Sequence, residues 1–357
     1  MKRPLLDASI EELVSWMAGR GHPAYRARQV LRWLFDRRGE TFAAMSDLPR
    51  PLREELAADW SALGTQVAYR SLAPDGTEKL LLECGDGRRV ECLLMTEEDR
   101  RTVCISTQVG CGMGCVFCAS GLKGVERNLT RGEIVEQVIR LRNLLPPGER
   151  LTNIVVMGMG ESLANLDNLI AALDRLCAPE GLGMSQRRVT ISTVGLPEKM
   201  RKLASLERHY HLAVSLHAPT EALRSRLVPV NERVGLGDVI AAANDYFRAT
   251  GRQVTYEYVL LSGINDRPED ASALGGLMRG RKAHVNLIPY NPVADLPFER
   301  PSDAAIRRFV ATIRGAGVSV SVRKTKGREI EAACGQLRRR IDTETPGRSP
   351  AAIGTPA

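Results

Sequence analysis

The first 62 residues have apolar positions at helical spacing. In the segment YRARQVLRWLFDRRG, one helical face gathers Val30, Leu31, Leu34 and Phe35. Asp7 or Ser9 can cap the preceding segment SIEELVSWMAG, because both residue types accept hydrogen bonds from the free N–H groups of a first helical turn. The pattern predicts an N-terminal helical accessory domain over residues 1–62.

Between residues 63 and 103 the pattern changes to short strand-like runs. In KLLLECGDGRRVECLLM, the turn residues Gly85, Asp86 and Gly87 separate two apolar runs, which is typical of a β-hairpin. We therefore expect an antiparallel β extension that links the helical domain to the rest of the chain.

Residues 104–340 alternate apolar strand-like runs with amphipathic helical segments such as TRGEIVEQVIRLRNLL. The strand-like runs are TVCIST, NIVVMG, RRVTIST, HLAVSLH, VTYEYVL and AHVNLIP. Such alternation favours a parallel sheet, and six units fall short of the eight in a complete barrel. The pattern predicts an α/β fold, a partial six-stranded (β/α) barrel open at one side; an ordinary doubly wound sheet is the alternative.

The two ends of the chain carry less pattern. Residues 341–357 are rich in Pro, Gly, Ser and Ala without a period, which predicts a disordered tail. Acidic residues interrupt the opening segment before any run long enough for a signal peptide, and the longest uncharged stretch, residues 102–122, is interrupted by Gly, Ser, Thr and Gln. We expect a cytoplasmic protein that does not contact membranes.

Composition adds two indications. The chain has 357 residues with eight cysteines, and without an export signal these favour reduced thiols in metal or redox chemistry. A net charge of +8 and a pI near 9.2 favour a polyanionic partner, because Lys and Arg placed opposite phosphates release condensed counterions.

Three cysteines stand close together in STQVGCGMGCVFCASG: Cys111, Cys115 and Cys118, spaced CxxxCxxC. Three thiolates on a glycine-rich loop can hold three irons of a [4Fe-4S] cubane and leave the fourth iron without a protein ligand. That iron can chelate S-adenosylmethionine (SAM) and pass an electron into its sulfonium, which yields a 5'-deoxyadenosyl radical. The alternatives are coincidental spacing and a structural zinc site, which normally has four ligands in two paired knuckles.

Polar residues recur at the carboxyl ends of successive predicted strands, where α/β barrels bind ligands. The turn GMGES supplies two of them, because backbone N–H groups of a glycine turn can approach a carboxylate or an amine. The predicted SAM-binding residues are Gly160, Glu161, Ser192, Ser215, Leu216, His217 and Asn291. Each taken singly is more often an ordinary loop or capping residue.

The order of TVCISTQVGC, the CxxxCxxC run, GMGES, SLHAP, NLIPYNP, VRKTKG and AACGQL resembles that of the RlmN/Cfr family over essentially residues 1–340. Phe117 also stands where the radical SAM superfamily has an aromatic residue. The resemblance implies a radical SAM barrel with a [4Fe-4S] cluster and SAM, which methylates a carbon of adenine in RNA. The implied partners are 23S rRNA, transfer RNA and an electron donor such as flavodoxin or ferredoxin, and the implied enzyme is a monomer.

The resemblance also assigns roles to residues outside the metal spacing. Cys334 would be methylated by one SAM, and a second SAM would supply the radical that removes a hydrogen from the S-methyl group before the methylene adds to adenine. Cys104 would then attack the Cys334 sulfur, and a transient disulfide would free the base. Glu91 matches the family's proton acceptor, although its sequence context alone favours a solvated strand glutamate.

Without the resemblance, Cys104 and Cys334 would be interpreted as buried apolar thiols. We assign no role to Cys84, Cys92 and Cys177.

The family divides into housekeeping enzymes, which act at adenine C2 of ribosomal and often transfer RNA, and resistance enzymes, which act at C8. QVGC, NLIPYNP and VRKTKG resemble the housekeeping branch. Ser162 departs from the proline usual in GMGEP, and the adjoining SLAN resembles the resistance branch. Three motifs resemble the housekeeping branch and one loop resembles the resistance branch, so the sequence favours methylation at C2. Methylation at C8 is the alternative.

Two groups of basic residues are candidates for RNA phosphate contacts: Arg26, Arg28, Arg32, Arg37 and Arg38, and near the other end Arg323, Lys324, Lys326 and Arg328. A solvated charged surface is the alternative for any one of them.

Two further functions stay open on the residues alone. A radical SAM activase that acts on a protein would not need the pair Cys104 and Cys334. A non-catalytic iron–sulfur or zinc protein that binds RNA would hold a fully ligated metal and would not cleave SAM.

Overall fold

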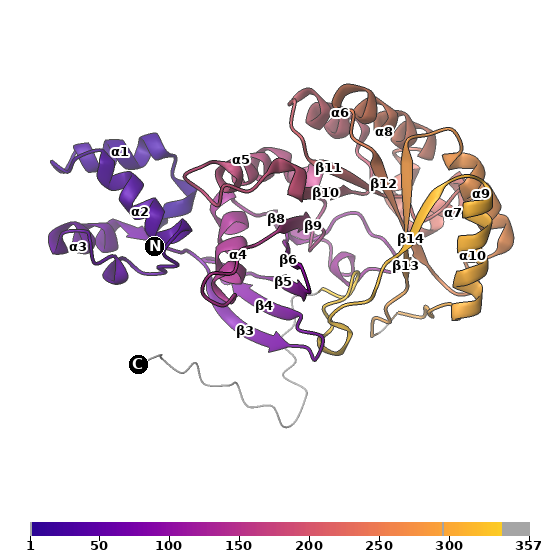
Figure 1. The fold of residues 1–357 in the computed structure, drawn as a ribbon, viewed down its shortest axis with the longest axis horizontal. Coiled ribbons are helices and arrows are strands. Elements are labelled where there is room, and N and C mark those ends of the chain that lie inside the picture. Colours follow the sequence, from indigo (N-terminus) through magenta and orange to yellow (C-terminus); the bar gives the residue numbers. More distant parts are fainter. Residues whose placement is uncertain (1, 295, 338–357) are drawn as a thin grey trace.

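The computed structural model describes residues 2–294 and 296–337 (Figure 1). Within them, a mixed sheet of ten strands has the order β14-β13-β12-β11-β10-β9-β6-β5-β4-β3. The parallel part consists of β6 (Arg100–Cys104), β9 (Asn153–Val156), β10 (Val189–Thr193), β11 (His211–Ser215), β12 (Val254–Leu260), β13 (Ala283–Pro289) and β14 (Ser319–Val322). The antiparallel part consists of β3 (Gln66–Leu72), β4 (Glu78–Glu83) and β5 (Arg89–Glu97).

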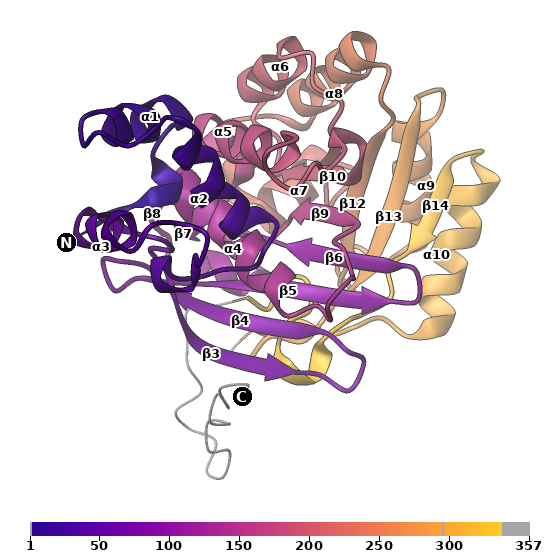
Figure 2. The same cartoon turned by 60° about the vertical axis from the view of Figure 1, so that its left-hand side comes forward.

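Helices follow the parallel strands and lie along the outer side of the curved sheet (Figures 1 and 2). They are α4 (Arg131–Asn143), α5 (Leu166–Cys177), α6 (Pro197–Ser205), α7 (Glu221–Leu227), α8 (Leu236–Thr250), α9 (Pro268–Met278) and α10 (Asp303–Gly315). The predicted α/β fold and its six strand–helix units are confirmed.

The count of six strands was one too low. Ser319–Val322 forms a seventh parallel strand, β14, which pairs with β13 from His284↔Ser319 to Leu287↔Val322. Only four residues are strand-like there, and a basic segment rather than a helix follows them, so the strand–helix alternation that marked the other units is missing.

The two faces of the parallel sheet differ in chemistry because successive side chains point to opposite faces. Tyr256 and Tyr258 of β12 are buried toward the helices, where the Tyr258 ring lies 5.5 Å from the Phe309 ring of α10, centroid to centroid. On the opposite face, Asn286 Nδ2 donates to Glu257 Oε2 at 2.9 Å. The inner face of the barrel is therefore polar.

The N-terminal segment forms α1 (Ile10–Ala18), α2 (Tyr25–Phe35) and α3 (Arg50–Asp59), with a short parallel pair of β1 (Arg3–Pro4) and β2 (Trp60–Ser61). The predicted apolar face of α2 is buried. Of the two candidate caps, Ser9 caps α1: its Oγ accepts from Glu12 N at 3.0 Å, and Glu12 Oε2 accepts from Ser9 N at 2.7 Å.

Asp7 instead joins the N-terminal segment to α4. Its Oδ1 accepts from Gly132 N at 2.7 Å, and its Oδ2 accepts from Thr130 Oγ1 at 3.1 Å. Residue 132 has to be a glycine for this approach, since a Cβ there would lie 2.8 Å from Asp7 Oδ1. Arg142 adds a second link, because its buried guanidinium donates to the carbonyl oxygens of Leu34 and Phe35 at the end of α2.

The predicted hairpin turn at Gly85–Gly87 is confirmed: it joins β4 to β5, and Gly87 N donates to Cys84 O at 2.9 Å. Antiparallel pairing of β5 with β6 makes this extension continuous with the barrel sheet. Each helix within the described residues is too short or too polar to cross a bilayer. The predicted disordered tail, residues 341–357, lies outside the described residues.

Replacement of Asp7 by alanine tests the junction between the N-terminal segment and α4. Loss of the two hydrogen bonds at the start of α4 should lower the free energy of unfolding by about 1 kcal/mol, as lost helix caps do. Urea denaturation measures the change. The control Asp36→Ala, which breaks an exposed pair with Arg32 at 3.5 Å, should cost less than about 0.5 kcal/mol. Equal losses in the two variants would contradict the assignment.

Candidate active site

The three cysteines spaced CxxxCxxC lie on a loop between two short paired strands, β7 (Gln108–Gly110) and β8 (Val125–Asn128). Backbone hydrogen bonds hold the loop: Cys111 N donates to Gly124 O and Cys118 N donates to Cys115 O, both at 3.1 Å. The thiols of Cys111, Cys115 and Cys118 are half-buried and line a single cavity. The loop therefore gathers the three sulfurs predicted to bind iron.

The cysteine loop suits a cubane better than a single ion. Within the described residues, no group of three or more His, Cys, Asp or Glu side chains is placed to hold one metal ion. In a cubane, each thiolate binds its own iron, so the sulfurs surround a volume and need not meet at one point. Burial raises the pKa of Cys111 to about 12 and that of Cys115 well above its ordinary value. Iron binding would displace these thiol protons.

The same cavity gathers most of the predicted SAM-binding residues at the carboxyl ends of the strands. Those that line it are Gly160, Glu161, Ser192, Ser215 and His217. Gly160 has φ 104°, and a Cβ there would lie 2.7 Å from the Gln108 side chain, so only glycine fits this turn. Ser192 Oγ and Ser215 Oγ lie 3.4 Å apart on neighbouring strands.

Glu161 is a buried carboxylate held by three donors. Its Oε1 accepts from Thr193 Oγ1 at 2.6 Å and from Leu163 N at 3.0 Å, and its Oε2 accepts from Val194 N at 2.8 Å. Burial raises the pKa of Glu161, whereas these hydrogen bonds lower it. The donors fix the carboxylate at the cavity wall, where an ammonium group of a ligand would complete its coordination.

His217 is neutral and has a defined tautomer. Burial, aided by the nearby Arg224 guanidinium, lowers the pKa of His217 to about 3. Its Nδ1 accepts from Val259 N at 3.0 Å, so the ring proton resides on Nε2. The ring packs edge-on against Phe117 of the cysteine loop, with centroids 4.8 Å apart. His217 therefore joins the end of β11 to the cysteine loop and can donate a hydrogen bond from Nε2.

Leu216 and Asn291 do not line this cavity. Leu216 is buried, and its N–H donates to Glu257 O at 2.9 Å. Asn291 lines an adjoining cavity, where its Nδ2 donates to Cys334 O at 3.3 Å and its Oδ1 accepts from Thr325 Oγ1 at 3.1 Å. In this structure Asn291 thus holds the Cys334 segment.

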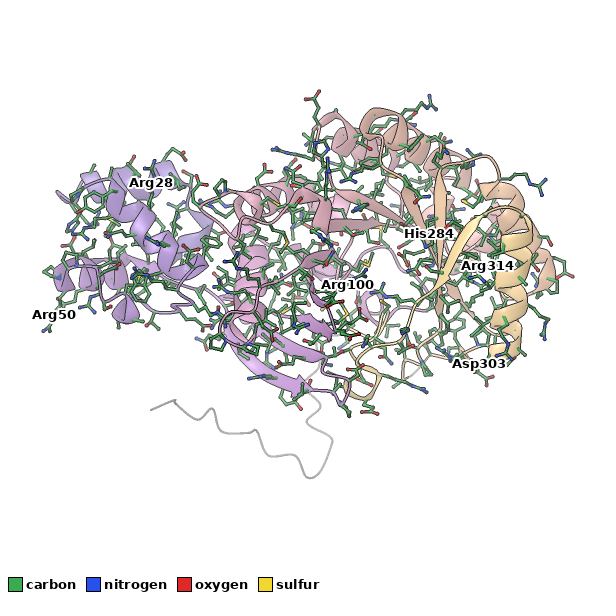
Figure 3. All side chains as sticks on the ribbon, viewed as in Figure 1. Arg28, Arg50, Arg100, His284, Asp303 and Arg314 are labelled. Atoms are coloured by element: carbon green, nitrogen blue, oxygen red, sulfur yellow. The ribbon has the colours of Figure 1, made fainter. Side chains whose placement is uncertain are left out.

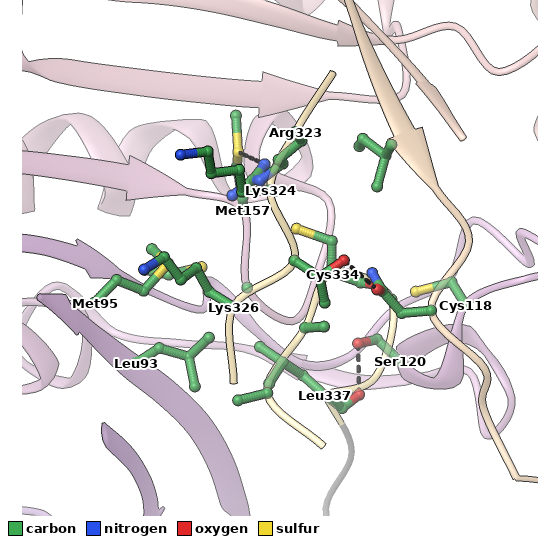
Figure 4. Close-up of a pocket in the computed structure, with 18 residues that line it drawn as sticks. Leu93, Met95, Cys118, Ser120, Met157, Arg323, Lys324, Lys326, Cys334 and Leu337 are labelled. Atoms are coloured by element: carbon green, nitrogen blue, oxygen red, sulfur yellow. Dashed lines mark hydrogen bonds between the residues drawn. The ribbon is translucent and has the colours of Figure 1, made fainter. Parts of the chain in front are cut away.

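The adjoining cavity is lined by both Cys104, at the end of β6, and Cys334. Figure 4 shows this cavity with Cys334 labelled. Both are free thiols. The Cys334 segment is attached to the cysteine loop, since Ala119 N donates to Gly335 O and Ser120 Oγ donates to Leu337 O, both at 2.8 Å. Cys118 and Cys334 line both cavities, so the two spaces share a wall.

Glu91 lines neither cavity but lies on the sheet face that carries Cys104. Leu93 pairs with Cys104 across β5 and β6, and Glu91 lies two residues from Leu93, on the same face. The side chain of Glu91 is 2% exposed, and its Oε1 lies 2.9 Å from Lys79 Nζ. Lys79 Nζ also donates to Glu331 O at 3.4 Å. The expectation of a solvated strand glutamate is therefore wrong.

Sequence reasoning missed four polar residues of this region: Lys79, Thr193, Arg224 and Glu257. Glu257 lines the cavity that the three cysteines line, and its place inside the apolar run VTYEYVL was a signal, since a charged residue there has to face a cavity or a partner. Lys79 and Arg224 gave no such signal, because their partners are distant in sequence or are backbone carbonyls.

The basic residues proposed for RNA contact divide into two kinds. Arg323 lines both cavities rather than the outer surface, and Arg38 donates to the carbonyl oxygens of Leu145, Pro146 and Glu149 after α4. Arg28 of α2, labelled in Figure 3, is by contrast exposed. Part of the basic surface is thus structural.

The Lys79–Glu91 pair can be tested by Lys79→Met. Loss of the cation beside a buried carboxylate should lower the free energy of unfolding by roughly 3 kcal/mol, the scale of broken buried ion pairs. Chemical denaturation should show a smaller loss for the double variant Lys79→Met/Glu91→Gln. The control Lys202→Met removes an exposed pair with Asp167 and should be nearly neutral. The pairing would be refuted if the double variant lost as much stability as the sum of the losses in the single variants Lys79→Met and Glu91→Gln.

Comparisons with known proteins agree with this geometry. The profile of the "Radical SAM superfamily" matches residues 105–274, and that of the "Ribosomal RNA large subunit methyltransferase N-terminal domain" matches residues 4–61. A crystal structure of a radical SAM methyltransferase from Sphaerobacter thermophilus is 44% identical, with a TM-score of 0.92 over 95% of this chain and all of that chain.

Two relatives carry the name "Probable dual-specificity RNA methyltransferase RlmN". That of Rhodopirellula baltica is 54% identical over 95% of this chain and 91% of its own length. That of Symbiobacterium thermophilum is 44% identical over 97% of this chain and 94% of its own length. With a radical SAM barrel, an RlmN-type N-terminal domain and this identity along nearly the whole chain, the protein belongs to the RlmN family of radical SAM RNA methyltransferases.

Proposed function

We propose that this enzyme methylates C2 of an adenine in the peptidyl transferase centre of 23S rRNA, and the adenine that follows the anticodon in some transfer RNAs. One observation carries the proposal: Cys104 and Cys334 line one cavity, and that cavity shares a wall with the one lined by the CxxxCxxC cysteines. A radical SAM enzyme that used only its cluster would not need this second thiol pair.

Cys111, Cys115 and Cys118 would hold the [4Fe-4S] cluster of the superfamily. Gly160, Glu161, Ser192, Ser215 and His217 would hold SAM, with the Glu161 carboxylate suited to an ammonium group and the His217 Nε2 proton to an acceptor. Leu216 and Asn291 do not line the cavity that these residues share, so their part in the proposed SAM site is indirect: Leu216 is buried behind it, and Asn291 holds the Cys334 segment. Bound together, cluster and SAM supply a methyl group and a one-electron abstraction of hydrogen.

Three residues of this chain would each carry out one part of the methyl transfer. The Cys334 sulfur takes up the methyl group, which then loses one hydrogen atom. The remaining carbon radical bonds to the base, and the one electron that the adduct has to lose would return to the cluster. Glu91 takes the proton displaced from the ring carbon, and Lys79 Nζ, 2.9 Å from Glu91 Oε1, holds the carboxylate in place. Cys104 attacks the Cys334 sulfur, so an S–S bond forms as the C–S bond to the base breaks. A proton completes the methyl group on the base, and a thiol reductant then returns the disulfide to two free thiols.

This route suits the substrate because a carbon between two ring nitrogens is a poor nucleophile, whereas radical addition does not require nucleophilicity. Two SAM molecules are used in each turnover.

A base in a stacked RNA also has to be extruded to reach a cavity, at a cost of a few kcal/mol. Outward arginines such as Arg28 would position the RNA backbone without reading its bases.

The departure at Ser162 is local. Its Oγ donates to Val156 O at 3.2 Å and its side chain is buried, so it completes the turn after β9 in a way that proline cannot. The matches at QVGC, NLIPYNP and VRKTKG outweigh this one departure, so we favour C2 over C8 for this chain. We further propose that it acts in the cytoplasm as a monomer and receives electrons from flavodoxin or ferredoxin.

Substitution of Cys115 by alanine should abolish the cluster, because a cubane held by two thiolates is readily lost. Iron and sulfide analysis of the anaerobically reconstituted protein measures the change. Cys177→Ala, on the outer helix α5, should keep one cluster per chain. A full cluster in Cys115→Ala would refute the assignment of ligands.

The thiol pair is tested with unmethylated ribosomal RNA, SAM and reductant, followed by nucleoside mass spectrometry. Wild-type enzyme should yield 2-methyladenosine, and 8-methyladenosine would refute the C2 proposal. Cys334→Ala should form no methylated adenosine yet still cleave SAM. Cys104→Ala should accumulate RNA bound covalently to protein, because the C–S bond to the base is not broken. Cys177→Ala should match the wild type.

A further inference from the structure

Arg224 of α7 is the largest side chain in the described residues that is completely buried, with 0% exposure. Arginine is almost never fully buried unless it is paired. Its Nε donates to Leu216 O at 3.2 Å, and its Nη2 donates to the carbonyl oxygens of Val194 and Ser215. These carbonyls stand at the ends of β10 and β11, beside the proposed SAM-binding residues.

The partners of Arg224 carry no net charge. Besides the three carbonyls, its Nη1 donates to the amide oxygen of Asn231, and within the part of the chain described the guanidinium takes part in no salt bridge. Glu221 is linked to it through Asn231, whose Nδ2 donates to Glu221 Oε2 at 2.7 Å, and the Glu221 charge opposes the lowering of the Arg224 pKa by burial without touching the guanidinium. Glu221 is itself exposed. A full positive charge is thus buried without an adjacent carboxylate.

The helix that carries Arg224 packs beneath the cysteine loop. Val116 N donates to Leu227 O, at the end of α7, at 3.1 Å. Leu223 and Leu227 belong to one apolar cluster with Phe117, against which Cys115 and Cys118 pack. Burial lowers the pKa of Arg224, and the Cys115 thiol acts in the opposite direction. The guanidinium therefore lies within electrostatic reach of a proposed cluster ligand.

We propose that Arg224 is a positioning residue that supplies the fixed positive counter-charge for the cluster and thereby raises its reduction potential. A cubane with three thiolate ligands carries a net negative charge, which grows by one on reduction. Buried charge is stable only when it is compensated, and nearby charge is one of the factors that set a cluster's potential. The inference rests on the proposed assignment of Cys111, Cys115 and Cys118 as ligands.

The test is a redox titration of the reconstituted full-length protein, followed by electron paramagnetic resonance. Arg224→Gln keeps hydrogen-bond donors but removes the charge, so its midpoint potential should be more negative by about 59 mV, a tenfold change in the reduction equilibrium. Arg224→Lys keeps the charge and should stay near the wild type. Arg226→Gln removes an exposed arginine from the same helix and should have no effect.

Equal potentials for the wild type and Arg224→Gln, with one cluster per chain in both, would overturn this inference and leave the proposed function standing. A cluster that persists in Cys115→Ala would instead overturn the proposed ligands. Denaturation of apo and cluster-loaded protein supplies a second measurement. A counter-charge predicts that Arg224→Gln costs more stability in the loaded protein than in the apo protein, whereas a purely structural role predicts equal losses, which would also overturn the inference.

Discussion

The parallel direction of seven strands is the constraint on which the rest of the site depends. Parallel strands bring their carboxyl ends to one edge of a sheet, so short segments after β9, β10 and β11 meet there although they are far apart in sequence. The cysteine loop follows β6, the strand beside β9, and reaches the same edge. The site is therefore built from several short segments that the sheet brings to one edge.

This arrangement buries several charged side chains, which is unfavourable, and the fold provides each of them with a hydrogen-bond or ion-pair partner. Glu161 meets three donors, Glu91 meets Lys79, and Glu257 accepts from Asn286. Each of these partners belongs to the protein itself. The charged groups are thus fixed before a ligand arrives, so little reorganisation is needed when charge shifts during the reaction.

Sequence patterns anticipated what depends on neighbours in the chain. The cap at Ser9, the turn at Gly85–Gly87 and the order of the strand–helix units follow from local spacing. The gathering of Glu161, Ser192 and Ser215 followed from one further rule, that strand ends meet. The same reasoning could have placed Glu257 in this cavity.

What the sequence did not reveal depends on partners far along the chain. Lys79 meets Glu331 O across 252 positions, and β14 becomes a strand only because β13 lies beside it. Arg323 belongs to a basic run that resembles a surface, yet β14 carries it to the cavities. The pairing of Cys104 with Cys334 was inferred from the family resemblance alone, since neither residue has a spacing that signals chemistry.

That pair also has to avoid reacting too early. Burial raises the pKa of Cys104 to about 12, with a smaller contribution from Cys334, whereas the Arg323 guanidinium lowers it. A thiol with this pKa is almost entirely protonated at neutral pH, and only the thiolate attacks sulfur. Cys104 is therefore inert toward Cys334 until its proton is removed or its surroundings become more polar. In the proposed cycle, Cys104 can displace the carbon from the Cys334 sulfur only after that carbon is bonded to the base, because the adenine ring can then hold the electron pair of the broken C–S bond. The apolar setting of Cys104, which sequence alone would interpret as mere packing, keeps its thiol protonated before that step.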